Sequence, residues 1–245
     1  FMKTHMIIGR SRFLFKLFVL NFLNLFKVTL IRTYKSPINF FKINLLLDVG
    51  ANIGQYAMHA RKGGYKEKIV SFEPLIDAHH ILTKASKGDS LWVVHSRCAV
   101  GGENSIVDIN IAQNSFSSSI LPILPSHVLA APKSKYIGKI ETNLITLDSI
   151  FNEYNDNNRI FLKIDTQGFE KDVLDGVLKN LKNIYVIQLE LSAVILYENQ
   201  KLYNYFFSFF NENNFSLWSL EPGFSDKETG RMLQFDAIFV NNKAL

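Results

Sequence analysis

A short glycine-containing segment, residues 48–54, constrains this chain more than any other part of it. It follows the apolar run at residues 45–47. An apolar run that breaks at glycine predicts a buried strand, a tight loop and then a helix. Gly50 and Gly54 let the main chain and the helix N-terminus approach a ligand closely, as in loops that hold nucleoside-bearing cofactors. The acid Asp48 favours a cofactor with a cationic amino-acid part, because a carboxylate there would repel a pyrophosphate.

The loop does not fit the dinucleotide pattern G-x-G-x-x-G. Gly50 matches its first glycine, but Asn52 and Gln55 stand at the other two glycine positions. A nicotinamide cofactor is therefore disfavoured.

The length of 245 residues is sufficient for one α/β domain with a core that needs neither disulfide nor metal. Cys98 is the single cysteine, so no intramolecular disulfide can form, and a reducing compartment fits.

Beyond residue 44, short apolar segments alternate with helical stretches, which is typical of βαβ units and a mostly parallel sheet with helices on both faces. We predict strands near residues 45–50, 68–73, 91–98, 160–165, 184–190, 214–220 and 233–240, the last one antiparallel. We predict helices at residues 54–63, 75–87, 146–155, 169–181 and 198–213.

The pattern changes between residues 101 and 143. Residues 104–112 alternate like a half-exposed antiparallel strand, and a polar run at residues 114–119 and a proline-bearing loop follow. An insertion that leads away from the carboxyl edge of a sheet is typical of a substrate cover. The serine-rich run suits either a polar ligand or a solvated turn.

Polar residues end several of the predicted strands, where ligands of open parallel sheets bind. Glu73 follows the glycine loop by about 20 residues, the spacing at which a carboxylate accepts hydrogen bonds from ribose hydroxyls. The alternative is that Glu73 only begins a solvated helix.

Lys163 and Asp165 lie on the same face of a later strand, and Glu190 ends the strand after it. The two acids could act as a general base or bind a divalent cation such as Mg²⁺. Alternatively, Asp165 caps a helix and Glu190 pairs with a lysine.

An N-terminal arm, residues 1–43, carries the basic charge of the protein. Residues 1–47 hold eight basic residues and no acid, which leaves 19 basic against 22 acidic residues in the remainder. Residues 13–31 are also rich in apolar side chains. Three interpretations remain open: a helix docked on the catalytic domain, a helix at an anionic membrane surface through residues 10–35, and a spanning helix. Nucleic acid is not an expected partner, because the arm interleaves its charges with aliphatic residues.

Six motifs together resemble the FkbM family of S-adenosylmethionine-dependent methyltransferases. They are LLLDVGANIGQY at residues 45–56, SFEP at 71–74, NSFSSSI at 114–120, ITLDSI at 145–150, LKIDTQGFE at 162–170 and QFDAIFV at 234–240. The resemblance covers residues 44–241, with the motifs in the family's order. LKIDTQGFE is the motif that narrows a class I methyltransferase to this family.

The resemblance implies a class I methyltransferase fold over residues 44–245, with a seven-stranded sheet and an antiparallel last strand. The implied contacts to the methionine and ribose parts of S-adenosylmethionine are Asp48, Gly50, Ala51, Asn52, Gly54 and Tyr56. Glu73 would bind the ribose hydroxyls and Ala99 the adenine. The family's members are O-methyltransferases that act on hydroxyls of sugars, polyketides and related metabolites.

The leading hypothesis is therefore O-methylation of a hydroxyl of a sugar or glycan, lipid-linked glycans included. Asp165 is the first candidate for the base, Glu190 the second, and Lys163 would orient a carboxylate or stabilise an alkoxide. Whether Mg²⁺ takes part stays open. The alternatives are a polyketide or other small-metabolite acceptor, and a membrane-tethered binding protein that has lost turnover. The expected location is cytoplasmic, peripheral at the inner face of the membrane if the arm binds there.

Overall fold

The computed structural model describes residues 36–154 and 158–245 of the chain. The helix and the membrane contact predicted for the N-terminal arm lie outside the described residues. The compact unit described below begins at Pro37, on the N-terminal side of the predicted domain boundary at residue 44.

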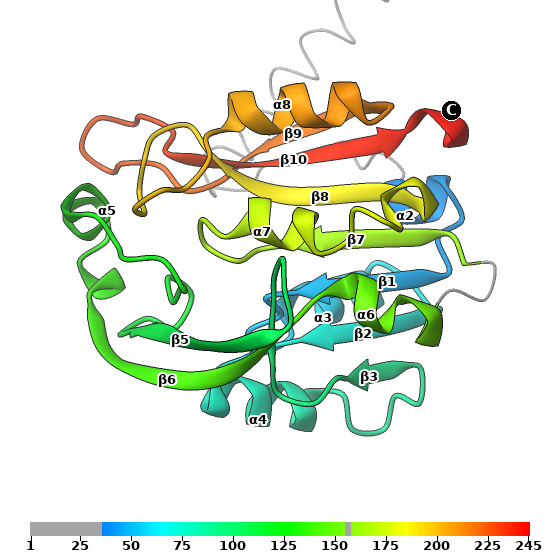
Figure 1. Ribbon diagram of the computed structural model, residues 1–245, viewed down its shortest axis with the longest axis horizontal. Coiled ribbons are helices and arrows are strands. Elements are labelled where there is room, and N and C mark those ends of the chain that lie inside the picture. The colour runs from blue at the N-terminus through cyan, green and yellow to red at the C-terminus, as the bar shows by residue number, and fades with distance from the viewer. Residues whose placement is uncertain (1–35, 155–157) are drawn as a thin grey trace, which may run out of the picture. The chain divides into compact units, whose positions relative to one another are not determined.

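The main sheet has seven strands in the order β3-β2-β1-β7-β8-β10-β9 (Figure 1). Their bounds are β1 Leu45–Val49, β2 Lys68–Phe72, β3 Trp92–Val94, β7 Ile160–Ile164, β8 Ile184–Ser192, β9 Phe215–Pro222 and β10 Gln234–Asn241. β10 runs antiparallel to both of its neighbours, β8 and β9. The predicted mostly parallel sheet with an antiparallel last strand is therefore confirmed. The strand order reverses between β1 and β7, and open sheets of this kind bind ligands at such a point.

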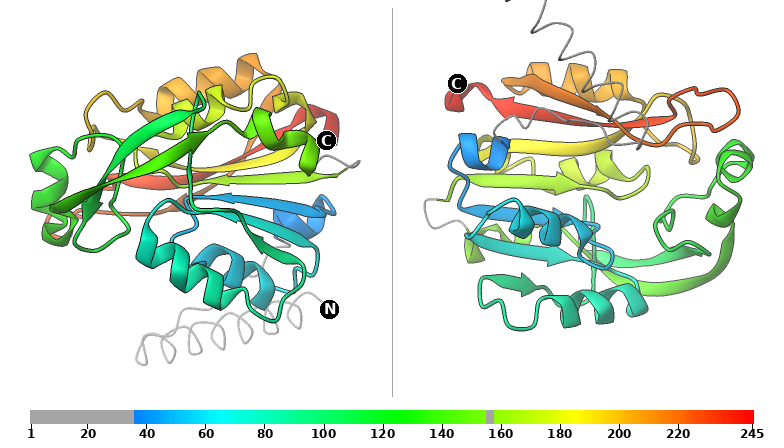
Figure 2. Two further views of the ribbon diagram at one scale, coloured as in Figure 1. Left: turned by 60° about the horizontal axis from the view of Figure 1, so that its bottom comes forward. Right: turned by 180° about the vertical axis from the view of Figure 1, so that it is seen from behind.

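Helices cover both faces of the main sheet (Figure 2). On one face lie α6 (Leu147–Ile150), α7 (Glu170–Asp175) and α8 (Tyr203–Glu212), and on the other α2 (Pro37–Phe40), α3 (Gln55–Lys62) and α4 (Ile76–Ala85). Short 3-10 helices are η1 Pro132–Ser134, η2 Phe151–Glu153, η3 Leu181–Asn183 and η4 Asn242–Ala244. Within the described ranges, no helix has both the length and the apolar character needed to cross a membrane.

Strand β1 shows why the apolar run at its start forms a central strand. All five of its residues are buried. Leu45 and Leu47 pack into the core under α6, α7 and α8, whereas Leu46 packs into the core under α3. A strand buried on both faces needs a continuous apolar sequence rather than an alternating one.

A second, smaller sheet lies beyond the carboxyl ends of the parallel strands (Figure 1). It has the order β4-β6-β5, with β4 Ala99–Val100, β5 Ser105–Ala112 and β6 Tyr136–Ile145. The predicted half-exposed antiparallel strand is β5, since it pairs antiparallel with β6 and packs Ile109 against Leu75 and Ala99. We call residues 101–143, which include α5 (Pro125–Ala130), the cover.

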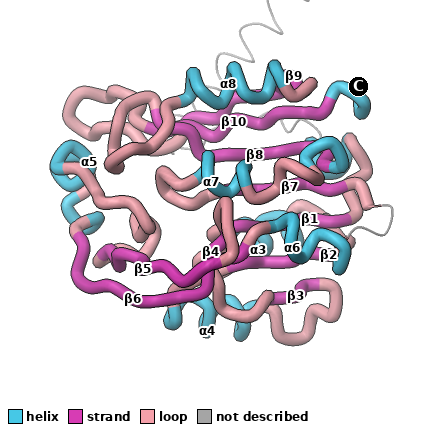
Figure 3. The backbone as a smooth tube through the Cα atoms, viewed as in Figure 1, coloured by secondary structure: helices cyan, strands magenta, loops and turns pink. Residues whose placement is uncertain are grey.

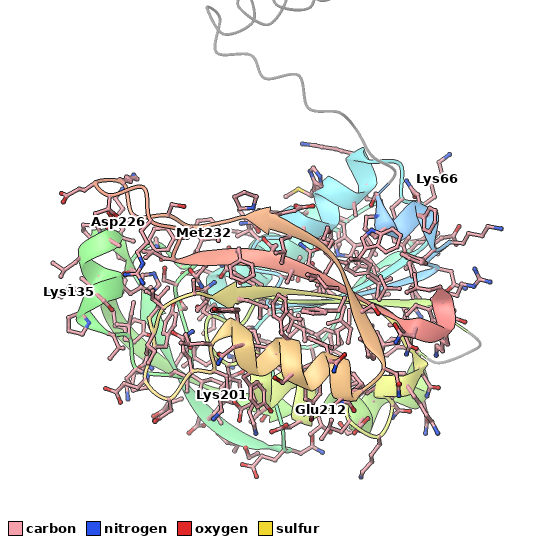
Figure 4. All side chains as sticks on the ribbon, turned by 90° about the horizontal axis from the view of Figure 1, so that it is seen from above. Lys66, Lys135, Lys201, Glu212, Asp226 and Met232 are labelled. Carbon is pink, nitrogen blue, oxygen red and sulfur yellow. The ribbon has the colours of Figure 1, made fainter. Side chains whose placement is uncertain are left out.

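Long loops gather around α5 at this end of the molecule (Figure 3). The loop between β9 and β10 is one of them: Figure 4 shows its residues Asp226 and Met232 on the same side of the protein as Lys135 of the cover. The rings of Phe224 in this loop and His127 in α5 have centroids 5.6 Å apart. The cover is thus supported from the far edge of the main sheet.

Three predicted elements differ from the structure. The strand predicted at residues 91–98 leaves the main sheet after Val94, and the chain then enters the smaller sheet at Ala99. The helix predicted at residues 169–181 ends at Asp175, and the next residue, Gly176, packs so closely on the carbonyl of Gly101 that a β-carbon there would overlap it.

The helix predicted at residues 198–213 begins only at Tyr203. The preceding residues form a turn instead, because the side-chain oxygen of Gln200 accepts hydrogen bonds from the main-chain N–H groups of Leu196 and Tyr197. Side-chain to main-chain hydrogen bonds of this kind compete with helix formation.

Candidate active site

A cavity of about 230 Å³ lies between the cover and the carboxyl ends of the parallel strands. Its lining comes from the glycine loop, the ends of β2, β7 and β8, and the cover. The lining residues are Val49, Gly50, Asn52, Phe72, Glu73, Pro74, Leu75, Cys98, Ala99, Val100, Ile109, Ser115, Phe116, Ser118, Ser119, Ile120, Asp165, Thr166, Gln167, Phe169 and Glu190. The serine-rich run of the cover therefore faces a cavity rather than forming a solvated turn.

The glycine loop turns at the end of β1 through left-handed main-chain conformations. Gly50 has φ +77°, and a β-carbon there would overlap the main-chain oxygen of Asp165. Asn52 has φ +46°, a conformation that asparagine adopts more readily than most residues. Gly54 has φ +92°, and a β-carbon there would lie 2.9 Å from the ring of Trp92. The glycines are thus required by close packing as well as by φ.

Glu73 ties the glycine loop to the end of β2. Its Oε2 accepts a hydrogen bond of 2.7 Å from the N–H of Asn52, and its Oε1 accepts one of 2.8 Å from the N–H of Leu75. The side chain is buried rather than the start of a solvated helix. Burial raises the pKa of Glu73 to about 7, against the opposing effect of the two main-chain donors. A carboxylate has about four acceptor positions, so Glu73 can still accept hydrogen bonds from a ligand.

The two ends of the cavity differ in character. Leu75, Ala99 and Ile109 belong to an apolar cluster at the end nearest the small sheet, and Phe169 packs against it. Asp165, Gln167 and Glu190 provide charged and amide groups at the ends of β7 and β8. The cavity can therefore hold a ligand with a flat apolar part and a polar or cationic part.

Gln167 holds the two acids of the polar end together. Its Nε2 donates a hydrogen bond of 2.9 Å to Oδ1 of Asp165 and one of 2.7 Å to Oε2 of Glu190. Gln234 of β10 donates a second hydrogen bond, 2.9 Å long, to the same Glu190 oxygen. Burial, and then the charge of Asp165, raise the pKa of Glu190 well above its ordinary value. Glu190 therefore bonds to the amides of Gln167 and Gln234 rather than to a lysine, which was the alternative.

A buried polar row crosses the main sheet beneath this pair. Asp48 stands in register with Ser71 on one side and Lys163 on the other, and Lys163 with Gln188. The Nζ atom of Lys163 lies 2.9 Å from Oδ1 of Asp236 and 3.8 Å from Oδ2 of Asp165. Together these carboxylates raise the pKa of Lys163, against the effect of burial.

Asp48 is the buried acid at the centre of this row. Ser71 donates a hydrogen bond of 3.3 Å to its Oδ2. Burial raises the pKa of Asp48 to about 7, although Lys163 opposes the shift. The carboxyl group of Asp48, inside the sheet, therefore gains or loses its proton near neutral pH.

Comparison with known proteins decides the family. The sequence profile described as "Methyltransferase FkbM domain" matches residues 48–217, more than half of the chain. The chain belongs to the FkbM methyltransferase family. S-adenosylmethionine is the expected cofactor of this methyltransferase. No curated protein matches the chain in sequence.

Solved structures with a similar fold share little sequence with this FkbM methyltransferase. Streptococcus pneumoniae Sp1610, solved with S-adenosyl-L-methionine, is 11% identical with a TM-score of 0.46, and the match covers 80% of this chain but only 65% of Sp1610. An rRNA methylase from Streptococcus thermophilus is 9% identical with a TM-score of 0.43, and the match covers 86% and 99% of the two chains. At these identities the similarity concerns the fold alone.

The cavity of the FkbM domain fits S-adenosylmethionine in its chemistry. Gly50 and Asn52 bring the main chain of the glycine loop to the cavity, and Glu73 keeps free acceptor positions. The apolar end suits a purine ring, and the acids at the other end suit the positive charges of the methionine part. In the described part of the chain, histidine, cysteine and acidic side chains form no cluster of three or more suited to a metal ion.

The predicted site residues fall into two groups in this structure. Gly50, Asn52, Glu73, Ala99, Asp165 and Glu190 line the cavity, whereas Asp48, Ala51, Gly54, Tyr56 and Lys163 do not. Tyr56 donates a 2.7 Å hydrogen bond to Oε1 of Gln188 in the polar row. Phe169 is the N-cap residue of α7. The alternative role of Asp165, as the cap of this helix, is therefore excluded. Whether the second group touches the cofactor stays a prediction.

Sequence reasoning missed three residues of the site. Gln167 lies within the LKIDTQGFE motif, but nothing in that motif predicts that its amide bonds to two acids. Tyr197 donates a hydrogen bond of 2.9 Å to Oε1 of Gln167 from 30 positions further along the chain. Phe116 lines the cavity from the cover. No local pattern marks either aromatic residue, since both reach the site through tertiary packing.

Proposed function

We propose that this FkbM-family protein transfers a methyl group from S-adenosylmethionine to a hydroxyl of a sugar or glycan. The observation that carries the proposal is the pair Asp165 and Glu190 at the polar end of the cavity, joined by the amide of Gln167. An alcohol becomes a good nucleophile only as its proton leaves, so a carboxylate beside the acceptor oxygen is what O-methylation requires.

The cofactor contacts that we propose follow the lining of the cavity. Gly50 and Asn52 would lie along the methionine and ribose parts, Glu73 would accept hydrogen bonds from the ribose hydroxyls, and Ala99 would face the adenine. Phe116 and Leu75 add apolar surface at the adenine end. Asp48 would act on the cationic part of the cofactor through its charge rather than by contact.

Glu190 is the better candidate for the general base. Its pKa is raised well above the ordinary value by burial and by the charge of Asp165, which makes its carboxylate a stronger base than an exposed glutamate. Among the described residues, both side-chain hydrogen bonds that Glu190 accepts fall on Oε2, so Oε1 is available to an acceptor. Lys163 balances the charge of Asp165 and Asp236 from below.

The reaction is an in-line displacement in which the protein chiefly orients the reactants. Bound S-adenosylmethionine supplies a methyl group on a sulfonium that is already a good leaving group. Glu190 would take the proton of the acceptor hydroxyl as the new carbon–oxygen bond forms and the methyl–sulfur bond of the cofactor breaks, with the demethylated thioether as the leaving group. Orientation accounts for much of the rate gain in reactions of this type.

A sugar acceptor is supported by the hydroxyl-rich part of the cover. Ser115, Ser118 and Ser119 line the cavity, and the hydroxyl of Ser119 donates a hydrogen bond of 2.7 Å to the main-chain oxygen of Gln167. Hydroxyl groups both donate and accept hydrogen bonds, which suits a ligand with several hydroxyls of its own. A polyketide or other metabolite would instead favour apolar side chains around its reacting hydroxyl.

Two measurements test the proposed function. Calorimetry with S-adenosylmethionine and with its demethylated product tests the cofactor, and Glu73→Ala should weaken binding of both. Methyl transfer from isotope-labelled cofactor to a panel of methyl glycosides, glycan fragments and hydroxylated polyketides tests the acceptor, with Glu190→Gln as the inactive control. Transfer to polyketides alone would assign the alternative acceptor class. Cofactor binding without transfer to any member of the panel would favour a binding protein without turnover.

A further inference from the structure

Gln167 has an unusual main-chain conformation for its residue type. It lies in the loop between β7 and α7 with φ +55°, and Gly168 follows with φ +97°. Left-handed conformations are uncommon for residues other than glycine, asparagine and aspartate, and at functional sites they often hold a side chain in place. Here the turn directs the amide of Gln167 between the ends of β7 and β8.

The amide of Gln167 makes three hydrogen bonds, and together they determine which way its nitrogen and its oxygen point. Its two N–H groups bond to Asp165 at 2.9 Å and Glu190 at 2.7 Å, and its oxygen accepts the hydroxyl proton of Tyr197 at 2.9 Å. The reversed amide would place an oxygen against two carboxylates. Tyr197 is fully buried, and its ring packs against Gly168, where a β-carbon would lie 3.1 Å from the ring.

We propose that Gln167 is a positioning residue of the methyl transfer, whose amide sets the separation of Asp165 and Glu190 and turns Oε1 of Glu190 toward the acceptor. The proposal rests on the proposed function, because it assigns Glu190 the role of base. Two carboxylates that converge on one cavity repel each other. The amide opposes this repulsion by giving one N–H group to each of them.

The main chain of Gln167 has a separate role in holding the cover. Its carbonyl oxygen accepts a hydrogen bond of 2.7 Å from the Ser119 hydroxyl. A substitution that disturbed the main chain would therefore loosen the cover as well. Asparagine distinguishes the two roles: it favours the left-handed conformation but is one methylene shorter, so it cannot reach both acids.

The test compares Gln167→Met, Gln167→Asn and Tyr197→Phe with the wild-type protein. The first readout is the pKa of Glu190 in the protein without an acceptor, from the ¹³C resonance of its carboxyl group, assigned with Glu190→Gln. The charged groups that face Glu190 are kept in all variants: Lys163 of β7, Asp165 in the loop after β7, Asp236 of β10 and Glu170 of α7. The second readout is the dissociation constant of S-adenosylmethionine, and the third is the pH profile of methyl transfer.

Loss of the amide bridge should raise the pKa of Glu190 further, by about one pH unit in Gln167→Met and Gln167→Asn. The kcat of methyl transfer should fall by about 10-fold to 100-fold near neutral pH and recover partly at higher pH. Affinity for S-adenosylmethionine should change by less than about 3-fold. Tyr197→Phe, which keeps both N–H donors, should show a smaller shift in the same direction.

An unchanged Glu190 pKa in Gln167→Met and Gln167→Asn would overturn the proposal. So would a loss of kcat that is the same at every pH, since that result indicates a structural role in the loop. Failure of the wild-type protein to bind S-adenosylmethionine or to methylate any acceptor is a different result, and it would count against the proposed function while leaving the titration of Glu190 readable.

Discussion

The main-chain oxygen of Asp165 occupies the place where a β-carbon of Gly50 would stand. The loops that follow β1 and β7 therefore touch main chain to main chain, and their close approach brings the candidate cofactor loop against the candidate catalytic acid. The N–H of Asp165 also donates a 3.0 Å hydrogen bond to the carbonyl of Val49.

Replacing Gly50 with alanine should both destabilise the protein and impair cofactor binding. The left-handed φ of +77° costs about 1–3 kcal/mol for a residue with a side chain, and the overlap with Asp165 adds to this. Urea unfolding and calorimetry with S-adenosylmethionine measure the two effects. Gly64→Ala is the matched control, because Gly64 has φ +89° but open space around it. Equal destabilisation of the two variants would show that the overlap is relieved at little cost.

Affinity for S-adenosylmethionine should rise as the pH increases through about 7. Burial raises the pKa of Glu73 to about 7, so its carboxylate is protonated below this pH and can accept fewer hydrogen bonds from the ribose. Calorimetry from about pH 6 to about pH 8 measures the change. Glu73→Gln should bind more weakly at the higher pH and lack this part of the pH dependence. If affinity changes with pH equally in the wild-type protein and in Glu73→Gln, a group other than Glu73 causes the pH dependence.

The stability of the protein should depend on the ionisation of Asp48. Its pKa is raised to about 7 in the folded protein from 3.8, so the folded state retains a proton that the unfolded state releases. The free energy of unfolding therefore falls as pH rises between these values. Relative to the wild-type protein, Asp48→Asn should gain on the order of 3 kcal/mol between about pH 5 and about pH 8. A difference in unfolding free energy that stays constant with pH would contradict the assignment.

Removing the Ser119 hydroxyl should loosen the cover. The hydroxyl donates to the carbonyl of Gln167 at 2.7 Å and accepts from the N–H of Leu121 at 3.0 Å. Ser119→Ala should cost about 1–3 kcal/mol and speed hydrogen exchange in residues 114–121. Ser126→Ala, which removes an exposed hydroxyl of α5, is the control. Exchange that is equally slow in both variants would mean that packing alone holds the cover.

Much of the fold could be predicted from the sequence because its signals are local. The apolar run of β1 predicts a strand buried on both faces, and β5 alternates as a half-exposed strand should. The ends of the helices were less predictable. Gly176, the residue after the last one of α7, packs against the carbonyl of Gly101, 75 positions earlier in the chain, and no pattern within the helix itself contains that contact.

Tyr56 illustrates the limit for the site. The family resemblance implies a cofactor contact for Tyr56, which stays a prediction. In the structure its hydroxyl donates to Gln188, and its ring centroid lies 5.8 Å from Nζ of Lys163 as a cation–π partner. The direction of a helical side chain depends on how the helix packs on the sheet. That packing is decided by residues on other strands.

The sequence by itself determined the strand–loop–helix unit at residues 45–62 and the acids that end β2, β7 and β8, because each depends on residues close together in the chain. It also indicated the family, through short motifs that are each local but are spread over residues 45–240. Only the tertiary structure decided that one glutamine would join Asp165 to Glu190 and that Tyr197 would orient it. It also placed Asp48 beside Lys163 and the serines of the cover over the cavity. These relationships follow from strand order and register, which are set by the packing of the whole domain.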